Sequence, residues 1–257
     1  MLQVQRVTVR YGGFTAVEDI TFEVPDGEFV AVVGPTGCGK SSLLNLVAGL
    51  LAPAQGTVLT GGRVVSAVNR DCGYMFQVDA LLPWKTALDN VLLGPMLRGV
   101  AKTEARQLAS EWVRRVGLTG FQDRYPHQLS GGQRKRVAMA QVLVNRPPIL
   151  LMDEPFSALD VQTRSLMEQE LLGLWQELGA TVLFVTHDLE EAIALSDRVL
   201  LLTAGPGARL KGDYRVDLPR PRNVVEARFT PGFADIYERV WNGLREEVLA
   251  SYARQRG

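Results

Sequence analysis

The feature that most constrains this chain is a glycine-rich loop between a short apolar run and an apolar helix. The loop has the spacing G-x-x-x-x-G-K-S and consists of Gly34, Pro35, Thr36, Gly37, Cys38, Gly39, Lys40 and Ser41. Glycines at this spacing let backbone N–H groups curl around an anion, and the N-terminus of the next helix adds partial positive charge. We therefore predict a P-loop, in which Lys40 reaches the β- and γ-phosphates of a nucleotide and Ser41 holds Mg²⁺. Ser42, directly after the loop, is a further candidate contact.

Composition limits the partners and the compartment. The 257 residues carry 28 Lys and Arg against 28 Asp and Glu, so the overall charge favours neither nucleic acid nor anionic lipid. Two cysteines do not make a disulfide framework and fit a reducing compartment. The N-terminus lacks a signal-peptide pattern, and no apolar run has the length of a spanning helix. We expect a soluble, cytoplasmic protein that reaches a membrane only through a partner.

The hydrophobic pattern predicts an α/β fold with an insertion. Residues 7–9 and 20–24 alternate as two half-exposed antiparallel strands, whereas residues 29–33, 149–152, 181–186 and 198–202 form buried strands. From about residue 83 the pattern becomes helical, with Thr86 and Thr103 as expected N-caps. Two successive amphipathic helices without a strand between them predict a helical subdomain inserted at about residues 83–146.

Polar side chains follow several of the buried strands. Gln77 ends the short strand 73–76, Asp153 and Glu154 end the run 149–152, and His187 ends the strand 181–186. In a P-loop protein, Asp153 is placed to contact Mg²⁺ and Glu154 to polarise a water for attack on the γ-phosphate. The alternatives are an acidic turn for the carboxylates and ordinary loop or structural roles for Gln77 and His187. Asp188 and Glu191 form a capping-box-like start of the next helix.

A second anion-binding pattern opens a later helix. The turn consists of Ser130, Gly131, Gly132 and Gln133, and it offers free N–H groups and a hydroxyl. Taken alone, such a turn is more often a plain loop. The basic run 134–136 after it is typical of a solvated helix face. Tyr11 by itself is an exposed residue at a strand end, and the amphipathic helix near residues 233–244 packs on the core or on a partner.

Six features of the sequence occur in the order and approximate spacing of an ABC-transporter ATPase subunit, which the chain resembles over about residues 2–205. They are the P-loop, Gln77, residues 129–133, the apolar run into Asp153 and Glu154, residues 157–160, and His187. The resemblance implies a P-loop NTPase (RecA-like) core with an antiparallel β-subdomain and an inserted α-helical subdomain. It implies an ABC ATPase domain at residues 1–205 and a C-terminal extension with an amphipathic helix at residues 206–257.

The resemblance also implies how the site is assembled. Two ATPase domains would dimerise head to tail, with ATP between the Lys40 loop of one and the Ser130 loop of the other. Tyr11 would stack on adenine, and Gln77 would sense Mg²⁺ and the attacking water. Asp160 would meet the opposite protomer, and His187 would contact the γ-phosphate. Lys135 and Gln141 stand where many members carry Gln and Arg.

A narrower similarity lies in residues 76–84, 88–91 and 217–222, which look like the branch that imports nitrate, sulfonates, taurine or related solutes. It implies a membrane-spanning permease subunit, a periplasmic or extracellular solute-binding protein, and a position on the inner face of the cell membrane. One alternative is a soluble ABC ATPase that acts on DNA, RNA or ribosomes, but the chain has no second ATPase domain, coiled coil or basic extension. Another is a non-catalytic regulator, with which an intact set of Lys40, Asp153, Glu154 and His187 conflicts.

Overall fold

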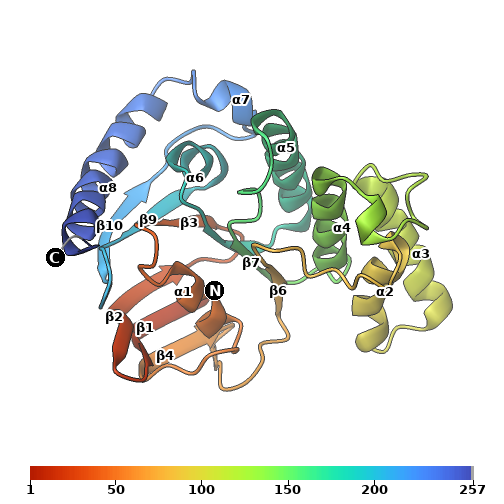
Figure 1. Ribbon diagram of the computed structural model, residues 1–257, viewed down its shortest axis with the longest axis horizontal. Coiled ribbons are helices and arrows are strands. Elements are labelled where there is room, and N and C mark those ends of the chain that lie inside the picture. The colour runs from red at the N-terminus through yellow and green to blue at the C-terminus, as the bar shows by residue number, and fades with distance from the viewer. Residues whose placement is uncertain (256–257) are drawn as a thin grey trace.

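A six-stranded, mostly parallel sheet forms the centre of the molecule. The structure is a computed structural model that describes residues 1–255, shown in Figure 1. The strands lie in the order β10-β9-β3-β8-β7-β6. Their bounds are β3 (Phe29–Val33), β6 (Cys72–Met75), β7 (Ile149–Asp153), β8 (Thr181–Val185), β9 (Arg198–Leu202) and β10 (Leu210–Arg215). All neighbours are parallel except β10, which pairs antiparallel with β9. Both faces are covered, as the continuous apolar runs predict.

A smaller antiparallel sheet packs below the first. It has the order β2-β1-β4-β5, and its strands are β1 (Leu2–Tyr11), β2 (Phe14–Val24), β4 (Gln55–Thr60) and β5 (Arg63–Val64). Ile20, Phe22 and Val24 of β2 are buried while Thr21 and Glu23 are exposed, so one face of this sheet is exposed to solvent. The two antiparallel strands are confirmed, but the alternation holds only at residues 20–24: at residues 7–9 Thr8 is buried as well as Val7 and Val9, and its hydroxyl accepts from the Asp19 N–H.

Helices cover the central sheet on both faces and create two cores. Between the two sheets lies α1 (Lys40–Val47), in a core with side chains of β1, β2 and the lower face of the central sheet. On the other face lie α5 (Val161–Leu178), α6 (Leu189–Leu195), the short α7 (Val224–Ala227) and α8 (Phe233–Gln255). There Trp175 of α5 packs edge-on against Phe29 of β3, with ring centroids 5.3 Å apart. The sheet is therefore rigidly held from both sides.

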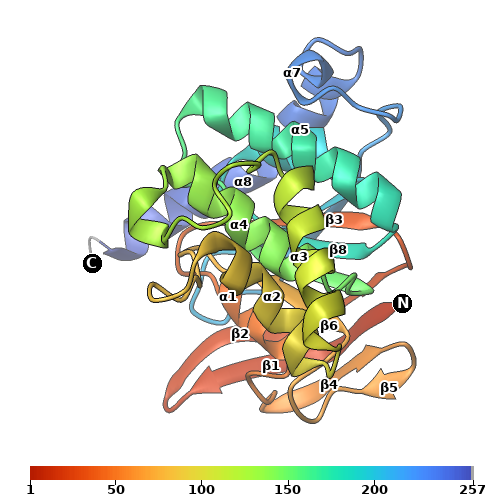
Figure 2. The ribbon, with the colours of Figure 1, turned by 90° about the vertical axis from the view of Figure 1, so that its right-hand side faces the viewer.

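A helical lobe projects from one side of the sheet. It contains α2 (Ala87–Leu97), α3 (Lys102–Arg115), the 3₁₀-helix η1 (Pro126–Gln128) and α4 (Gly131–Leu143), which Figures 1 and 2 show beside β6 and α5. Thr86 caps α2 by accepting from the Asp89 amide, as predicted. The prediction for Thr103 is wrong, because α3 begins at Lys102 with Ala101 as its N-cap and without a side-chain cap. Val100 packs against the core just before this turn, so packing sets the start of the helix.

The C-terminal part is integrated into the main sheet. The sequence did not indicate β10, because its residues are alternately half-buried and exposed and include Lys211, Asp213 and Arg215. Such polar edge strands carry little hydrophobic signal. The amphipathic helix packs on the core: Phe233 and Val240 of α8 are buried, and α8 contacts α6, β9 and β10. Within residues 1–255, no helix combines the length and hydropathy needed to cross a bilayer.

Candidate functional site

The carboxyl ends of four parallel strands meet at one edge of the central sheet. The glycine loop follows β3, Gln77 follows β6, Glu154 follows β7 and His187 follows β8. Ligands of open α/β sheets bind at this edge. It opens into a cavity of about 570 Å³ lined by Tyr11, Phe14, Ala16, Thr36, Gly37, Gly39, Lys40, Ser41, Ser42, Gln77, Glu154 and His187. Residues from five separate stretches of sequence thus share one cavity.

Lys40 lies in the middle of the glycine loop. Its side chain is buried, and Nζ donates to the carbonyls of Gly34 at 2.9 Å and Pro35 at 3.1 Å. Gly39 has φ 95°, and a Cβ there would lie 2.5 Å from Cγ1 of Val17, so only glycine fits. Among the described residues, no hydrogen bond engages the backbone N–H groups of Gly37 and Gly39. A positive charge and open N–H groups at a helix N-terminus form a cradle that fits a phosphate.

Ser41 and Asp153 form an oxygen-rich pair beside Lys40. The Ser41 hydroxyl donates to Oδ1 of Asp153 at 3.1 Å. Burial raises the pKa of the Asp153 carboxyl, and the Ser41 hydrogen bond opposes that rise. Residues 1–255 hold no cluster of three or more acidic, His or Cys side chains able to cage a metal alone. One hydroxyl and one carboxylate next to a phosphate cradle nevertheless fit Mg²⁺, which takes few protein ligands and completes its shell with water and phosphate oxygens.

Glu154 is held in a strained backbone conformation. Its φ is 43°, a region that non-glycine residues rarely adopt. The Glu154 N–H donates to the Val185 carbonyl at 2.9 Å, and the Glu154 carbonyl accepts from the Ser157 hydroxyl at 3.0 Å. In the side chain, Oε2 accepts from Nε2 of Gln77 at 3.3 Å and lies 2.9 Å from Nδ1 of His187. An oriented carboxylate with one engaged oxygen can take a proton from a water in the cavity.

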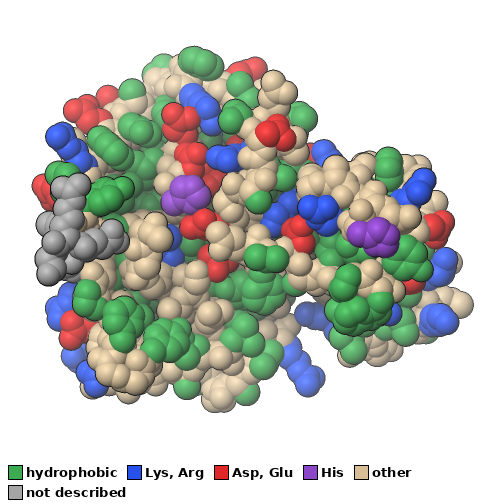
Figure 3. Space-filling model, viewed as in Figure 1, with side chains coloured by type: hydrophobic (Ala, Val, Ile, Leu, Met, Phe, Trp, Pro, Cys, Tyr) green, Lys and Arg blue, Asp and Glu red, His purple; other side chains and the backbone are tan. Residues whose placement is uncertain are grey.

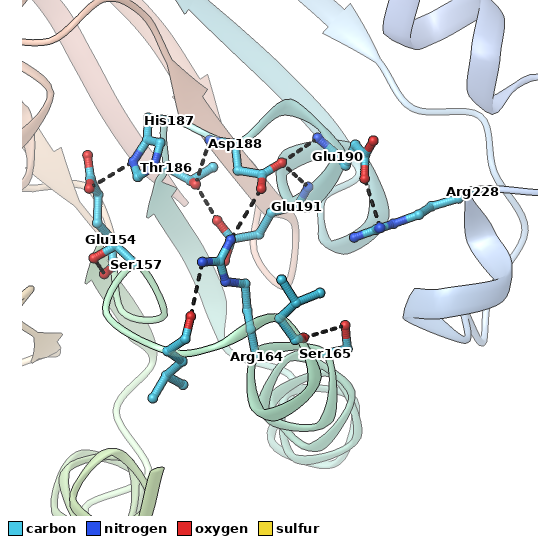
Figure 4. A network of polar contacts seen from close by, with 12 residues as sticks. Glu154, Ser157, Arg164, Ser165, Thr186, His187, Asp188, Glu190, Glu191 and Arg228 are labelled. Atoms are coloured by element: carbon cyan, nitrogen blue, oxygen red, sulfur yellow. Dashed lines mark hydrogen bonds and ion pairs between the residues drawn. The ribbon is translucent and has the colours of Figure 1, made fainter. Parts of the chain in front are cut away.

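A buried polar network supports the turn that carries His187 (Figure 4). The Thr186 hydroxyl donates to Oε2 of the buried Glu191 and accepts from the Asp188 N–H at 3.0 Å. Burial raises the pKa of Glu191 to about 8. Arg164 of α5 pairs with Asp188 at 3.4 Å and donates to the carbonyl of Leu159 at 3.2 Å, next to Asp160. The residue 157–160 segment and the His187 turn are therefore joined.

The predicted capping box at α6 is half right. Oδ1 of Asp188 accepts from the N–H groups of Glu190 and Glu191, so Asp188 is the N-cap. The reciprocal half is wrong, because the Glu191 carboxylate contacts Thr186 rather than the Asp188 N–H. Burial of Glu191 beside Thr186 overrides the local cap.

Two aromatic side chains border the cavity on the side of β1 and β2. Tyr11 and Phe14 face each other across the turn at Gly12 and Gly13, and both are about half exposed. The Tyr11 hydroxyl lies 3.1 Å from that of Ser42. Sequence reasoning missed Phe14 and also Ala16. The pairing of Phe14 with Tyr11 could have been found, since two strands joined by Gly-Gly predict a two-residue hairpin.

Other predicted residues lie outside this cavity. Ser130 is the N-cap of α4: its hydroxyl accepts from the Gln133 N–H at 3.2 Å, and Gln133 accepts from the Ser130 N–H at 2.9 Å. None of residues 130–133, hereafter the Ser130 loop, lines the cavity. Asp160 caps α5 by accepting from the Thr163 N–H at 3.0 Å. Cys38 is fully buried behind the loop, and burial raises the pKa of its thiol.

The sequence predicted a solvated helix face for the basic run at residues 134–136. This prediction is only partly right. Arg136 is half-buried and pairs with Glu170 of α5 at 2.5 Å. Lys135 is buried and contacts the residues around Gln77. On the face of the molecule in Figure 3, basic and acidic side chains are interspersed rather than gathered by sign.

Comparison with known proteins decides the family. The family model described as ABC transporter matches residues 17–157. The chain belongs to the ABC transporter family. An ABC transporter ATP-binding protein of Methanocaldococcus jannaschii is 48% identical over 92% of this chain and 86% of its own length. A taurine import ATP-binding protein of Escherichia coli is 45% identical over 100% of this chain and 98% of its own. A nitrate import ATP-binding protein of Synechococcus elongatus is 42% identical over 93% of this chain but 37% of its own.

Solved structures agree with this assignment. A dimeric bacterial ABC transporter cassette has a TM-score of 0.76 and 33% identity, covering 85% of this chain and all of the other. A post-hydrolysis dimer of such a cassette bound to ADP and phosphate has a TM-score of 0.75 at the same identity and coverage. The expected P-loop NTPase fold is confirmed, and the chain is an ATP-binding ABC ATPase. The resemblance drawn from the sequence is confirmed with it.

Proposed function

We propose that this ABC ATPase powers the import of a small solute of the nitrate, sulfonate or taurine type. The observation that carries the proposal is the 45% identity to a taurine import ATP-binding protein along essentially the whole of both chains. The identity to a nitrate import protein supports the same branch. The solute itself would be selected by a membrane-spanning permease and an extracellular or periplasmic binding protein. The ATPase would then act at the inner face of the membrane.

The residues that line the cavity would have different roles during ATP hydrolysis. Lys40 and the open N–H groups of the glycine loop bind the β- and γ-phosphates, and Glu154 takes a proton from the attacking water. Gln77 and His187 hold the Glu154 carboxylate in place, within 3.3 Å and 2.9 Å of Oε2. Tyr11 and Phe14 contact the adenine. Positioning and charge neutralisation, rather than covalent chemistry, then lower the barrier.

Mg²⁺ is part of this proposal. Ser41 and Asp153 are the residues that would hold it, with Gln77 nearby, because their oxygens lie beside the phosphate cradle. When bound, Mg²⁺ neutralises charge on the β- and γ-phosphate oxygens. Burial raises the pKa of Asp153, and a nearby cation would oppose that rise because it favours the ionised carboxylate.

The site is completed by a second copy of the chain in a head-to-tail dimer. The Ser130 loop lies outside the cavity but begins with the N-cap of α4, and a helix N-terminus of this kind can bind an anion. Dimeric structures of similar cassettes support this arrangement. We further propose that the chain consists of an ATPase domain at residues 1–205, with its helical subdomain at about 83–146, and a C-terminal extension at 206–257.

Import is tested in the native cell. The gene is replaced by one encoding Lys40→Met, and uptake of labelled taurine, nitrate and a short alkanesulfonate is measured. We expect loss of uptake of at least one solute, with Lys102→Met, an exposed lysine of α3, as the matched control. Parental uptake of all three solutes in the Lys40→Met cells would refute the proposal for this solute class.

A further inference from the structure

A buried lysine joins α4 to the backbone of Gln77. Lys135 is 4% exposed, and its Nζ donates to the Gln77 carbonyl at 2.8 Å. The same ammonium forms an ion pair with Oδ1 of Asp79 at 2.9 Å, and Asp79 also pairs with Arg134 at 3.5 Å. A buried charge is retained only where partners compensate its desolvation. Here the partners all lie in the short segment after β6.

The contacts of Gln77 point in two directions. Its backbone carbonyl is held by Lys135, whereas its side-chain amide reaches Oε2 of Glu154 at 3.3 Å. Glu154 in turn lies 2.9 Å from His187. A displacement of Lys135 would therefore move Gln77 relative to the carboxylate that orients the attacking water.

The N-terminal end of α4 carries the Ser130 loop, close in sequence to Lys135. Ser130 caps the helix and Lys135 lies on the turn that follows, so the two belong to one rigid element. Figure 1 shows α4 between α5 and α2, and contacts to α2, α3, α5 and β6 fix its position. Any force on Ser130 is thus transmitted along a single helical segment to Lys135.

We infer that Lys135 is a positioning residue that couples the two nucleotide sites of the dimer. This inference rests on the proposed head-to-tail arrangement, in which the Ser130 loop binds the nucleotide of the partner. Binding there fixes α4, α4 fixes Lys135, and Lys135 sets Gln77 against Glu154 in the chain's own cavity. Hydrolysis in one cavity then depends on occupancy of the other.

Lys135→Met tests the coupling in the full chain. The substitution keeps the length and apolar stem but removes the ammonium. In steady-state hydrolysis with Mg-ATP, we expect kcat to fall about tenfold and the Hill coefficient to fall from near 2 to near 1, since coupling energies of this kind alter equilibria by about 5- to 150-fold. Nucleotide affinity of the single chain should be unchanged. A purely structural defect scales the rate at every ATP concentration and leaves the Hill coefficient at the parent's value.

Two further variants keep the test decisive. Asp79→Asn retains the shape of the segment and weakens the hold on Lys135, so it should lower the Hill coefficient in the same direction even if Lys135→Met folds poorly. Lys102→Met, on the surface of the same lobe, should match the parent. Parental kcat and Hill coefficients in both Lys135→Met and Asp79→Asn would overturn the inference about Lys135 but leave the proposed dimer intact. A parent that hydrolyses ATP without cooperativity would contradict the proposed dimer and the coupling together.

Discussion

The two regions for which we propose phosphate binding differ in how complete they are. The glycine loop meets Asp153, Glu154 and His187 at one sheet edge. Ser41 contacts Asp153, and His187 contacts Glu154 in the cavity that the loop lines. The Ser130 loop has a similar helix N-terminus, yet it lies outside that cavity, and the Ser130 and Gln133 side chains each bond to the other residue's backbone N–H. Parallel strands bring the first set together, whereas in the proposed dimer the loop on the helical lobe meets the nucleotide of a second chain.

Glu154→Gln gives the largest expected effect on the complete half of the site. Loss of a general base slows hydrolysis by roughly 10²- to 10⁴-fold, while the amide keeps the size of the side chain and nucleotide binding persists. Phosphate release and nucleotide affinity are measured on the same preparation. Glu104→Gln, an exposed change on α3, is the control. Turnover near the parental rate in Glu154→Gln would remove this residue from the chemistry.

Lys40→Met is expected to have the next largest effect, on binding rather than on proton transfer. The charge-assisted hydrogen bonds of one ammonium are worth about 1.5–3 kcal/mol, which corresponds to a loss of ATP affinity of about 10- to 150-fold. Titration with a fluorescent ATP analogue measures it. The same loss of affinity in Ser130→Ala, measured on the single chain, would contradict the contrast between the two regions.

Glu191→Gln is expected to have the smallest effect, a change in the stability of the folded protein. The pKa of Glu191 is about 8 in the folded protein against an ordinary value of 4.5, so between these values the folded state binds more protons than the unfolded chain. Stability from this group is therefore present below about pH 4.5 and is lost as the pH rises toward 8. We expect Glu191→Gln to melt at least about 2 °C above the parent at pH 8.5, with a smaller difference at pH 5. Equal melting curves at pH 8.5 would show that the carboxylate is not penalised by burial.

The sequence predicted the cavity well because each of its elements is encoded locally. The glycine loop is contiguous, and Gln77, Asp153, Glu154 and His187 each end a recognisable strand, so parallel pairing was enough to bring them together. Roles assigned to these residues remain predictions.

The features that escaped depend on distant contacts. Phe14 reaches the cavity because the hairpin register places it opposite Tyr11. The polar strand β10 lies at the edge of the sheet and is recognised only by its pairing with β9. Thr103 is not the expected N-cap, because α3 begins one residue earlier, next to Val100, which packs against the core. Lys135 looked like part of a solvated basic run, and only its burial against Gln77 and Asp79 distinguishes it from its neighbours.

The mass of the Glu154→Gln variant with Mg-ATP tests most directly whether the site is divided between two chains. Light scattering should give a dimer with ATP and a monomer without it. Adding Ser130→Arg should return the protein to a monomer while each chain still binds ATP, because only the second half of the site is blocked. A Glu154→Gln protein that stays monomeric with saturating Mg-ATP, or a double variant that still dimerises fully, would contradict the account.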